Sequence, residues 1–249
     1  MSLEGARILL LQARLKTDPM APHEHQCFAD ALRVPRAQIT VHDGIESPPD
    51  ASVLARHDMM VIGGSGDFSV TDGEAWLPPF FSFLREFVVE RRFPTFGSCF
   101  GFQALVVAGG GVVITDLDRS EIGTFDVDVT PAGKDDPLFA ALSPRFTVQL
   151  GHKDRATGLP DGYVHVASTE RCPYQAFRLR GSHVVATQFH PELSRAATIT
   201  RYKHYLSLYQ LNPPAPGERD PVIDGFRDSD DATDLLPRWA DEVLSDRVR

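Results

Sequence analysis

The sequence predicts an α/β fold of three layers, with a mostly parallel central sheet covered by helices on both faces. In the first half of the chain, short apolar segments typical of buried strands alternate with helical segments. Alternation of this kind is typical of parallel strands joined by helices. The second half holds several strand-like segments separated by short turns, which predict a smaller antiparallel region or an extension of the main sheet.

Each element follows from a local pattern. The strands expected in the first half are 7–11, 39–42, 59–62 and 93–96, and the helices are 22–32, 78–92 and 102–108. The prolines at 78 and 79 suit a helix N-terminus, and glycines 109 to 111 end the last of these helices. The second half predicts strands at 123–130, 145–150, 163–168, 174–178 and 183–188, followed by a helix over 194–209.

The bulk composition is that of an ordinary globular protein. Of 249 residues, 42% are hydrophobic and 24% are charged, and no apolar stretch is long enough to span a membrane. The first residues lack the pattern of a signal peptide, and the three cysteines form no CxxC pair, so we expect a cytoplasmic location. A net charge of −9 without a basic run argues against nucleic acid as a partner. We expect neither a nucleic acid nor a membrane partner.

A change in composition divides the chain after residue 210. Residues 1–210 form the expected main domain, and 211–249 begin with a proline-rich breaker and carry an excess of acidic groups. The stretch from Thr233 to Asp246 has a helical pattern, with one side formed by Leu235, Leu236, Trp239 and Val243. An exposed patch of this kind would be adhesive, so we expect the helix to pack onto the domain or onto a second copy.

A cysteine lies at the junction of a predicted strand and a predicted helix. The segment Gly97-Ser98-Cys99-Phe100-Gly101 places Cys99 in a tight turn, where the flanking glycines remove steric clashes. The positive end of the following helix favours a thiolate there. An isolated cysteine at a strand end is commonly a core residue, but the G-x-C-x-G pattern at this junction favours a nucleophile.

A base and an orienting group follow another apolar strand, in Gln188-Phe189-His190-Pro191-Glu192. His190 would lie at the sheet edge as general base, and Glu192 can fix its tautomer. The loop Gly63-Gly64-Ser65-Gly66 also follows a strand and could offer backbone N–H groups to an oxyanion, although a glycine-rich loop alone is weak evidence. It lacks the G-K-[ST] of a phosphate-binding loop.

Together these segments resemble the class I glutamine amidotransferases over about residues 5–210. The segments are similar to the family's G-x-C-x-G-x-Q, Q-F-H-P-E and G-G-P-G-D motifs, with Ser65 where proline is usual. Weaker similarities are Glu121-Ile122-Gly123 to E-x-G, and Gly151-His152-Lys153-Asp154 to S-H-x-D. The resemblance implies a flavodoxin-like three-layer fold for residues 1–210.

The resemblance also implies a mechanism and a set of site residues. Cys99 would attack the glutamine side-chain amide to give a γ-glutamyl thioester and ammonia, with His190 as base and Glu192 as orienter. The N–H groups of Gly64 and Phe100 would form the oxyanion hole. The substrate-binding residues implied are Gly66, Gln103, Gly151, His152, Lys153 and Asp154. The resemblance implies no cofactor, and ammonia would pass to a separate synthetase or other acceptor subunit.

Three other readings of the same residues remain open. A γ-glutamyl peptidase or hydrolase would use the same triad on a γ-glutamyl small molecule. A thiol stress protein or intracellular protease of similar layering typically has histidine directly after the cysteine, where this chain has Phe100. A non-enzymatic relative with a relic site is opposed by the presence of all three triad residues.

One further cluster, His23-Glu24-His25-Gln26-Cys27, holds three types of metal ligand. On a helix, His23 and Cys27 share a face but His25 does not. We interpret these residues as the surface of a helix and predict no metal site.

Overall fold

The computed structural model describes residues 3–206 and 218–246. Its main sheet has nine strands in the order β2-β1-β3-β4-β11-β10-β9-β6-β7, and a second sheet pairs β5 with β8. The strands of the main sheet are, in that order, Ile39–Asp43, Ile8–Gln12, Met59–Ile62, Thr95–Ser98, Val184–Thr187, Ala176–Leu179, Tyr163–Ser168, Glu121–Val129 and Arg145–His152. Strands β5 and β8 are Val113–Thr115 and Asp154–Ala156.

The sheet has a parallel half and an antiparallel half. Strands β1, β2, β3, β4 and β11 pair in parallel, and their register aligns Ile62 with Gly97 and Thr187 with Ser98. Strands β10, β9, β6 and β7 continue the sheet with antiparallel pairing. The antiparallel segments therefore extend the main sheet, and the only separate pairing among the described residues is β5 with β8. The predicted three-layer α/β fold is confirmed.

Helices cover both faces of this sheet. The α-helices are α1 (Met20–Leu32), α2 (Ala51–Ala55), α3 (Leu77–Phe83), α4 (Phe100–Ala108), α5 (Arg195–His204), α7 (Pro221–Asp224), α8 (Asp230–Thr233) and α9 (Leu235–Asp246). Short 3₁₀ turns are η1 (Leu3–Gly5), η2 (Arg36–Gln38), η4 (Leu117–Arg119), η5 (Gly133–Asp135) and η6 (Phe139–Ala141), and η3 (Leu84–Glu90) is π-helical. None of the described helices is both long enough and apolar enough to cross a membrane.

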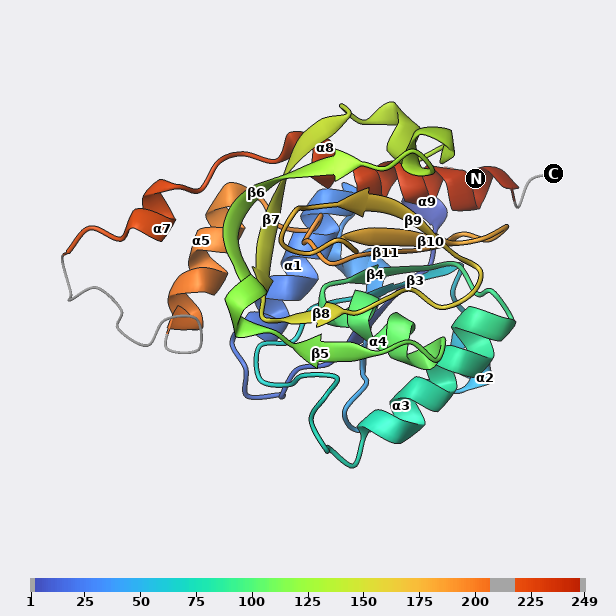
Figure 1. The fold of residues 1–249 in the computed structure, drawn as a ribbon. Helices are drawn as coiled ribbons and strands as arrows, with labels where there is room; N and C mark the ends of the chain where they lie inside the picture. The colour runs from blue at the N-terminus through green and yellow to red at the C-terminus, as the bar shows by residue number, and fades with distance from the viewer. Residues whose placement is uncertain (1–2, 207–217, 247–249) are drawn as a thin grey trace.

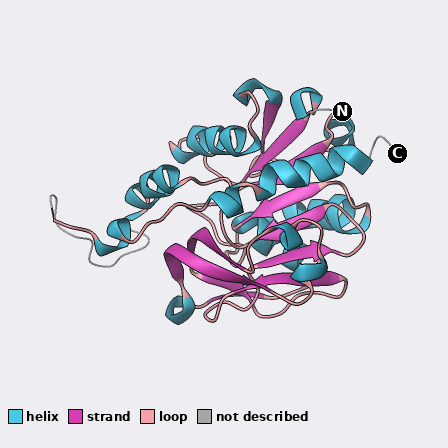
Figure 2. Cartoon of the chain, turned by 90° about the horizontal axis from the view of Figure 1, so that it is seen from above, coloured by secondary structure: helices cyan, strands magenta, loops and turns pink. Residues whose placement is uncertain are grey.

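The alternation of side chains along the strands sorts them into two cores. Leu10 in β1 and Phe96 in β4 belong to the core on the face covered by α1 and α9. Leu11 and Ile62 point the other way, into the core beneath α3, η3 and α4. Figure 1 shows α9 and α3 on opposite sides of the sheet, and Figure 2 shows the strands from above with helices on either side.

Several expected boundaries differ from those observed. The strand expected at 93–96 lies at Thr95–Ser98, so it leads directly into Cys99. The helix expected over 78–92 continues after Phe83 as the π-helical η3. The spacing of apolar residues in a π-helix is close to that in an α-helix, so the sequence pattern does not distinguish the two. Helix α5 ends at His204, and the remainder of the helix expected to residue 209 lies partly outside the described residues.

Helix α9 forms part of the core. Its four predicted apolar residues, Leu235, Leu236, Trp239 and Val243, are at most 1% exposed. The indole Nε1 of Trp239 donates to the carbonyl of His183 over 2.8 Å, and its ring meets Phe96 edge to face. The packing of this helix onto the domain is thus confirmed, and the tail contributes directly to the layer beneath the strand that leads to Cys99.

Replacing Trp239 with alanine is expected to lower the free energy of unfolding by about 3–5 kcal/mol. The reason is the cavity left beside Phe96 and the loss of the indole hydrogen bond to His183. Urea unfolding followed by circular dichroism measures the change. Val112→Ala, at a position 57% exposed, is the control and should change stability by less than about 0.5 kcal/mol. A loss for Trp239→Ala as small as the control's would show that α9 contributes little to the core.

Candidate active site

Cys99 forms a strained turn between β4 and α4. Its φ of 50° and ψ of −97° lie in a region that residues with a side chain rarely adopt. The backbone N–H of Cys99 donates to the carbonyl of Thr187 over 2.8 Å, which ties the turn to β11. The strain is held by the sheet on one side and the first turn of α4 on the other, and it projects the thiol out of the strand.

The two glycines that flank Cys99 are required by close packing. A Cβ on Gly97 would lie 2.9 Å from the backbone carbon of Gly101, and a Cβ on Gly101 would lie 2.7 Å from the carbonyl oxygen of Ile62. Both contacts involve backbone atoms, which have little freedom to move. The G-x-C-x-G spacing therefore permits the start of α4 to press against β3 and β4.

The structure brings His190 and Glu192 together behind this turn. His190 Nδ1 lies 2.7 Å from Glu192 Oε1, and both side chains are buried. The bond to the carboxylate places the Nδ1 proton and leaves Nε2 for the thiol, which also contacts the imidazole. Ser98 Oγ donates to the other oxygen, Glu192 Oε2, over 2.8 Å.

Charge in this pair overcomes the effect of burial. Burial alone would lower the pKa of His190, but Glu192 and Cys99 raise it to about 9. Burial would raise the pKa of Glu192, whereas His190, Arg201 and Ser98 lower it to about 2. The neighbouring charges therefore favour the ionised form of Glu192 and make His190 a stronger base than a free imidazole.

Replacing Glu192 with glutamine should lower the pKa of His190 from about 9 toward its ordinary value of 6.5. NMR titration of the His190 ring protons measures this shift. The raised pKa of His190 stabilises the fold fully below pH 6.5, and this contribution is lost as pH rises through about 9. The lowered pKa of Glu192 stabilises it fully above pH 4.5, and this contribution is lost as pH falls through about 2.

The stability difference between the wild type and Glu192→Gln should therefore be greatest between about pH 4.5 and 6.5. Denaturant unfolding at several pH values tests this window. A difference that does not vary with pH would show that the pair contributes packing rather than charge.

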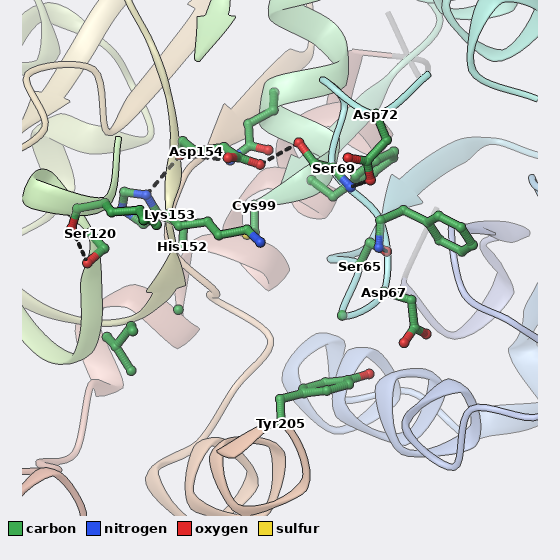
Figure 3. Close-up of a pocket in the computed structure, with 17 residues that line it drawn as sticks. Ser65, Asp67, Ser69, Asp72, Cys99, Ser120, His152, Lys153, Asp154 and Tyr205 are labelled. Atoms are coloured by element: carbon green, nitrogen blue, oxygen red, sulfur yellow. Dashed lines mark hydrogen bonds between the residues drawn. The ribbon is translucent and has the colours of Figure 1, made fainter. Parts of the chain in front are cut away.

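Cys99 opens onto a pocket with a cavity of about 270 Å³. Its walls come from the loop after β3, the start of α4, the segment around the start of β6, and residues 151–154 at the turn from β7 to β8. Tyr205, which follows α5, completes the lining. Figure 3 shows Cys99 in the middle, with Lys153 extending toward it from one side and Ser65 and Asp67 on the other. Of the residues that the resemblance implied for substrate binding, Gly66, Gln103, Gly151, His152, Lys153 and Asp154 all line this pocket.

Two glutamines connect the thiol to the pocket wall. Gln188 Nε2 donates to Cys99 Sγ over 3.7 Å, and Gln103 Nε2 donates to Gln188 Oε1 over 3.2 Å. Gln103 also donates to the carbonyl of Asp154. The Asp154 carboxylate accepts a hydrogen bond from the Ser69 hydroxyl, so the loop after β3 is held to the start of β8 at the pocket wall (Figure 3).

A second buried pair supports the loop at the end of β7. His152 Nε2 lies 3.0 Å from Glu121 Oε2, while its Nδ1 faces the carbonyl of Asp154. The ligand atoms of Glu121, His152 and Cys172 lie within 4.8 Å of one another, as in a metal site. Because the Glu121 oxygens already accept bonds from His152, Thr169 and Gln175, we interpret the group as a hydrogen-bonded support of the loop.

The two amides implied for the oxyanion hole differ in their surroundings. Phe100 is the first residue of α4, where a backbone N–H has no partner within the helix. The N–H of Gly64 donates instead to Glu24 Oε1 over 3.1 Å. A Cβ on Gly64 would lie 2.9 Å from His190 Cε1, so the loop passes directly beside the imidazole.

The sequence analysis missed four side chains around Cys99, His190 and Glu192, namely Ser98, Gln188, Arg201 and Glu24. The first two belong to the quoted motifs, where their types alone could have suggested them. Arg201, on α5, donates to Glu192 Oε1 over 3.3 Å. The interpretation of residues 23–27 as helix surface is wrong for Glu24 and Cys27, which are buried, because α1 packs its polar residues against the site as well as its apolar ones against the sheet.

Comparisons with known proteins identify relatives of this chain. Residues 28–203 match the family model described as glutamine amidotransferase class-I. The GMP synthase (glutamine-hydrolyzing) of Thermosipho africanus is 36% identical over 115 residues, which are 46% of this chain and 21% of that protein. The match thus spans about a fifth of that relative's length.

Solved structures share the fold. A glutamine amido transferase from Methylobacillus flagellatus superposes with a TM-score of 0.71 at 22% identity, covering 98% of this chain and 94% of that one. The glutaminase domain of a Trypanosoma brucei CTPS, solved with bound acivicin, gives a TM-score of 0.55 at 19% identity, covering 82% and 95%. Because the family model matches residues 28–203, which are more than half of the chain, the chain belongs to the class-I glutamine amidotransferases.

Proposed function

We propose that this protein hydrolyses the side-chain amide of glutamine through a cysteinyl γ-glutamyl thioester and releases ammonia. The observation that carries the proposal is the meeting of three groups: the strained Cys99, the buried imidazole of His190, and the Glu192 carboxylate 2.7 Å from it. Membership of the amidotransferase family supports glutamine as the substrate.

The chemistry follows from these positions. The Cys99 thiol gives its proton to His190 Nε2, and the sulfur attacks the amide carbon. The tetrahedral oxyanion is stabilised by the N–H of Phe100, and the N–H of Gly64 can join it only after leaving Glu24, to which it donates. As the C–N bond breaks, the imidazolium returns the proton to nitrogen and ammonia leaves. Water, deprotonated by His190, then cleaves the thioester to glutamate and regenerates the thiol.

The pocket supplies groups for the amino-acid end of the substrate. Lys153 can pair with a carboxylate, and the carboxylates of Asp67 and Asp72 can pair with an ammonium group. Gly66 and the loop of residues 151–154 line the same pocket from opposite sides of Cys99. We propose these residues, together with Gln103, as the substrate-binding set.

A γ-glutamyl hydrolase is the second candidate, and the extent of the pocket favours it. The pocket extends to Leu117 and Ser120, which leaves room for a leaving group larger than ammonia. The same triad would then cleave a γ-glutamyl conjugate.

Steady-state assays separate the two candidates. Ammonia release from glutamine is compared with amine release from γ-glutamyl dipeptides, using Cys99→Ala as the blank. A higher kcat/KM for glutamine supports the amidotransferase, and a higher value for the dipeptides supports the hydrolase. Absence of thiol-dependent turnover with both substrates would contradict the proposed function.

We further propose that ammonia reaches an acceptor on a separate synthetase subunit. Relatives named GMP synthase support this, since the matched region is about a fifth of such a protein's length. Glutaminase activity that rises when a candidate synthetase is added would support the pairing, and purified components that neither bind nor stimulate one another would contradict it for that candidate.

A further inference from the structure

Behind the pocket, a buried carboxylate on α1 lies between two arginines. Glu24 is fully buried, and its Oε1 accepts from Arg14 Nη2 over 3.1 Å, while Arg201 Nη2 lies 3.9 Å away. Its other oxygen accepts from Gln12 Nε2. Burial opposes a charged Arg14, but Glu24 is the main group that raises the pKa of that guanidinium above its ordinary value. A carboxylate so placed is a strong hydrogen-bond acceptor.

The same Oε1 binds the backbone of the loop beside the nucleophile. Glu24 Oε1 accepts the N–H of Gly64, and a Cβ on Gly63 would lie 2.4 Å from the Glu24 carboxyl carbon, so loop and carboxylate are in tight contact. On the opposite side of the same peptide, the carbonyl of Gly63 accepts the N–H of Gly101 over 3.3 Å.

These two bonds define the direction of the Gly63–Gly64 peptide. In a trans peptide the C=O and the N–H point in opposite directions. The carbonyl points to the first turn of α4, where Phe100 and Cys99 lie, and the N–H points away to Glu24. In this orientation the loop presents the carbonyl oxygen of Gly63, and not the N–H of Gly64, to the N-terminal end of α4.

Glu24 also reaches the base through one side chain. Arg201 contacts Glu24 with Nη2 and Glu192 with Nη1, at 3.9 and 3.3 Å. A continuous buried series of charges therefore runs from His190 through Glu192 and Arg201 to Glu24 and the loop amide. Glu24 does not line the pocket, so it acts on bound substrate only through the groups it holds.

We propose that Glu24 is a positioning residue that sets the direction of the Gly63–Gly64 peptide and restrains its N–H from the oxyanion. The proposal rests on the amide-hydrolysing function given above. Turning the peptide would break the charge-assisted bond to Glu24 and supply a second donor to the tetrahedral intermediate. One such donor is worth about 10²–10³ in kcat, so the strength of the restraint limits the rate.

Two substitutions weaken the restraint in different ways. Glu24→Gln keeps the size but makes the acceptor neutral, which roughly halves the strength of the bond to Gly64. Glu24→Asp keeps the charge for Arg14 and Arg201 but withdraws the carboxylate by one methylene, and it covers the case in which Glu24→Gln does not fold. Asp18→Asn is the matched control, because Asp18 binds Arg14 over 3.0 Å within the same buried cluster.

Each variant is assayed for kcat and KM with the better γ-glutamyl substrate and for the rate of Cys99 alkylation by iodoacetamide. Alkylation forms no oxyanion, so it reports the thiol and its base alone. We expect both Glu24 variants to raise kcat about 3- to 10-fold, with KM and the alkylation rate within about twofold of the wild type. Asp18→Asn should leave all three values within about twofold.

Unchanged or lower kcat in a folded Glu24 variant would overturn the proposal, as would an equal rise in Asp18→Asn. If the wild type turns over no γ-glutamyl substrate, the proposed function fails, and the Gly64 amide signal in the ¹⁵N NMR spectrum decides the role of Glu24. A signal that moves in Glu24→Gln but not in Asp18→Asn supports the restraint, and one that stays in place in both overturns it.

Discussion

Replacement of Cys99 with serine is expected to reduce amide hydrolysis by at least about 1,000-fold while leaving the fold intact. A serine hydroxyl at this turn is a far weaker nucleophile than a thiol beside His190. The backbone bond from Cys99 to Thr187, which fixes the turn, does not involve the side chain. Ammonia release measures the activity, and thermal unfolding confirms the fold.

Cys27→Ala is the matched control for this change. Cys27 is also buried, and burial raises the pKa of its thiol to about 12, so it stays protonated near neutral pH. The Cys27 variant should keep most of the activity, and iodoacetamide should still label a single cysteine. If Cys99→Ser retained more than a few per cent of the activity, Cys99 would not be the nucleophile.

Replacement of His190 with alanine should cost about 100- to 10,000-fold in kcat/KM. Without the imidazole, the thiol has no base and the leaving nitrogen has no acid. The matched comparison is Glu192→Gln, for which we expect a smaller loss. Ser98 Oγ lies 3.3 Å from His190 Nδ1, so it can take over part of the orienting role when the carboxylate is absent.

The pH dependence of kcat/KM adds a check that is independent of the size of the loss. The change in kcat/KM that follows the titration of His190 should disappear in His190→Ala. In Glu192→Gln it should move to lower pH, since Glu192 raises the pKa of the imidazole. A larger loss in Glu192→Gln than in His190→Ala would mean that the two roles must be exchanged or abandoned.

The sequence was informative where function is encoded in local runs of residues. Gly97 and Gly101 mark the turn that holds Cys99 because each lies against backbone atoms that leave no space for a side chain. His190 and Glu192 are two positions apart, so their pairing is also a local property. Much of the parallel half of the sheet could also be predicted, because β1, β3 and β11 are short apolar runs buried on both faces.

The parts that the sequence did not disclose depend on contacts between distant segments. Glu24 and Gly64 are 40 residues apart, and in a helix with polar neighbours a buried glutamate has the same pattern as an exposed one. Arg201 reaches Glu192 from α5 in the same way. These charges are buried only when α1, α5 and the loop after β3 come together. The sequence pattern of any one of these segments therefore does not predict their burial.

The position of α9 has a consequence for synthesis of the protein. A nascent chain that has emerged only as far as α5 has the eleven strands that the described residues form, but it lacks Trp239 and the leucines that complete the core over β4. The α1 face of the sheet is then open along its apolar residues, a surface that chaperones bind and that favours aggregation. Folding of the turn that holds Cys99 is therefore expected to wait until α9 has been translated.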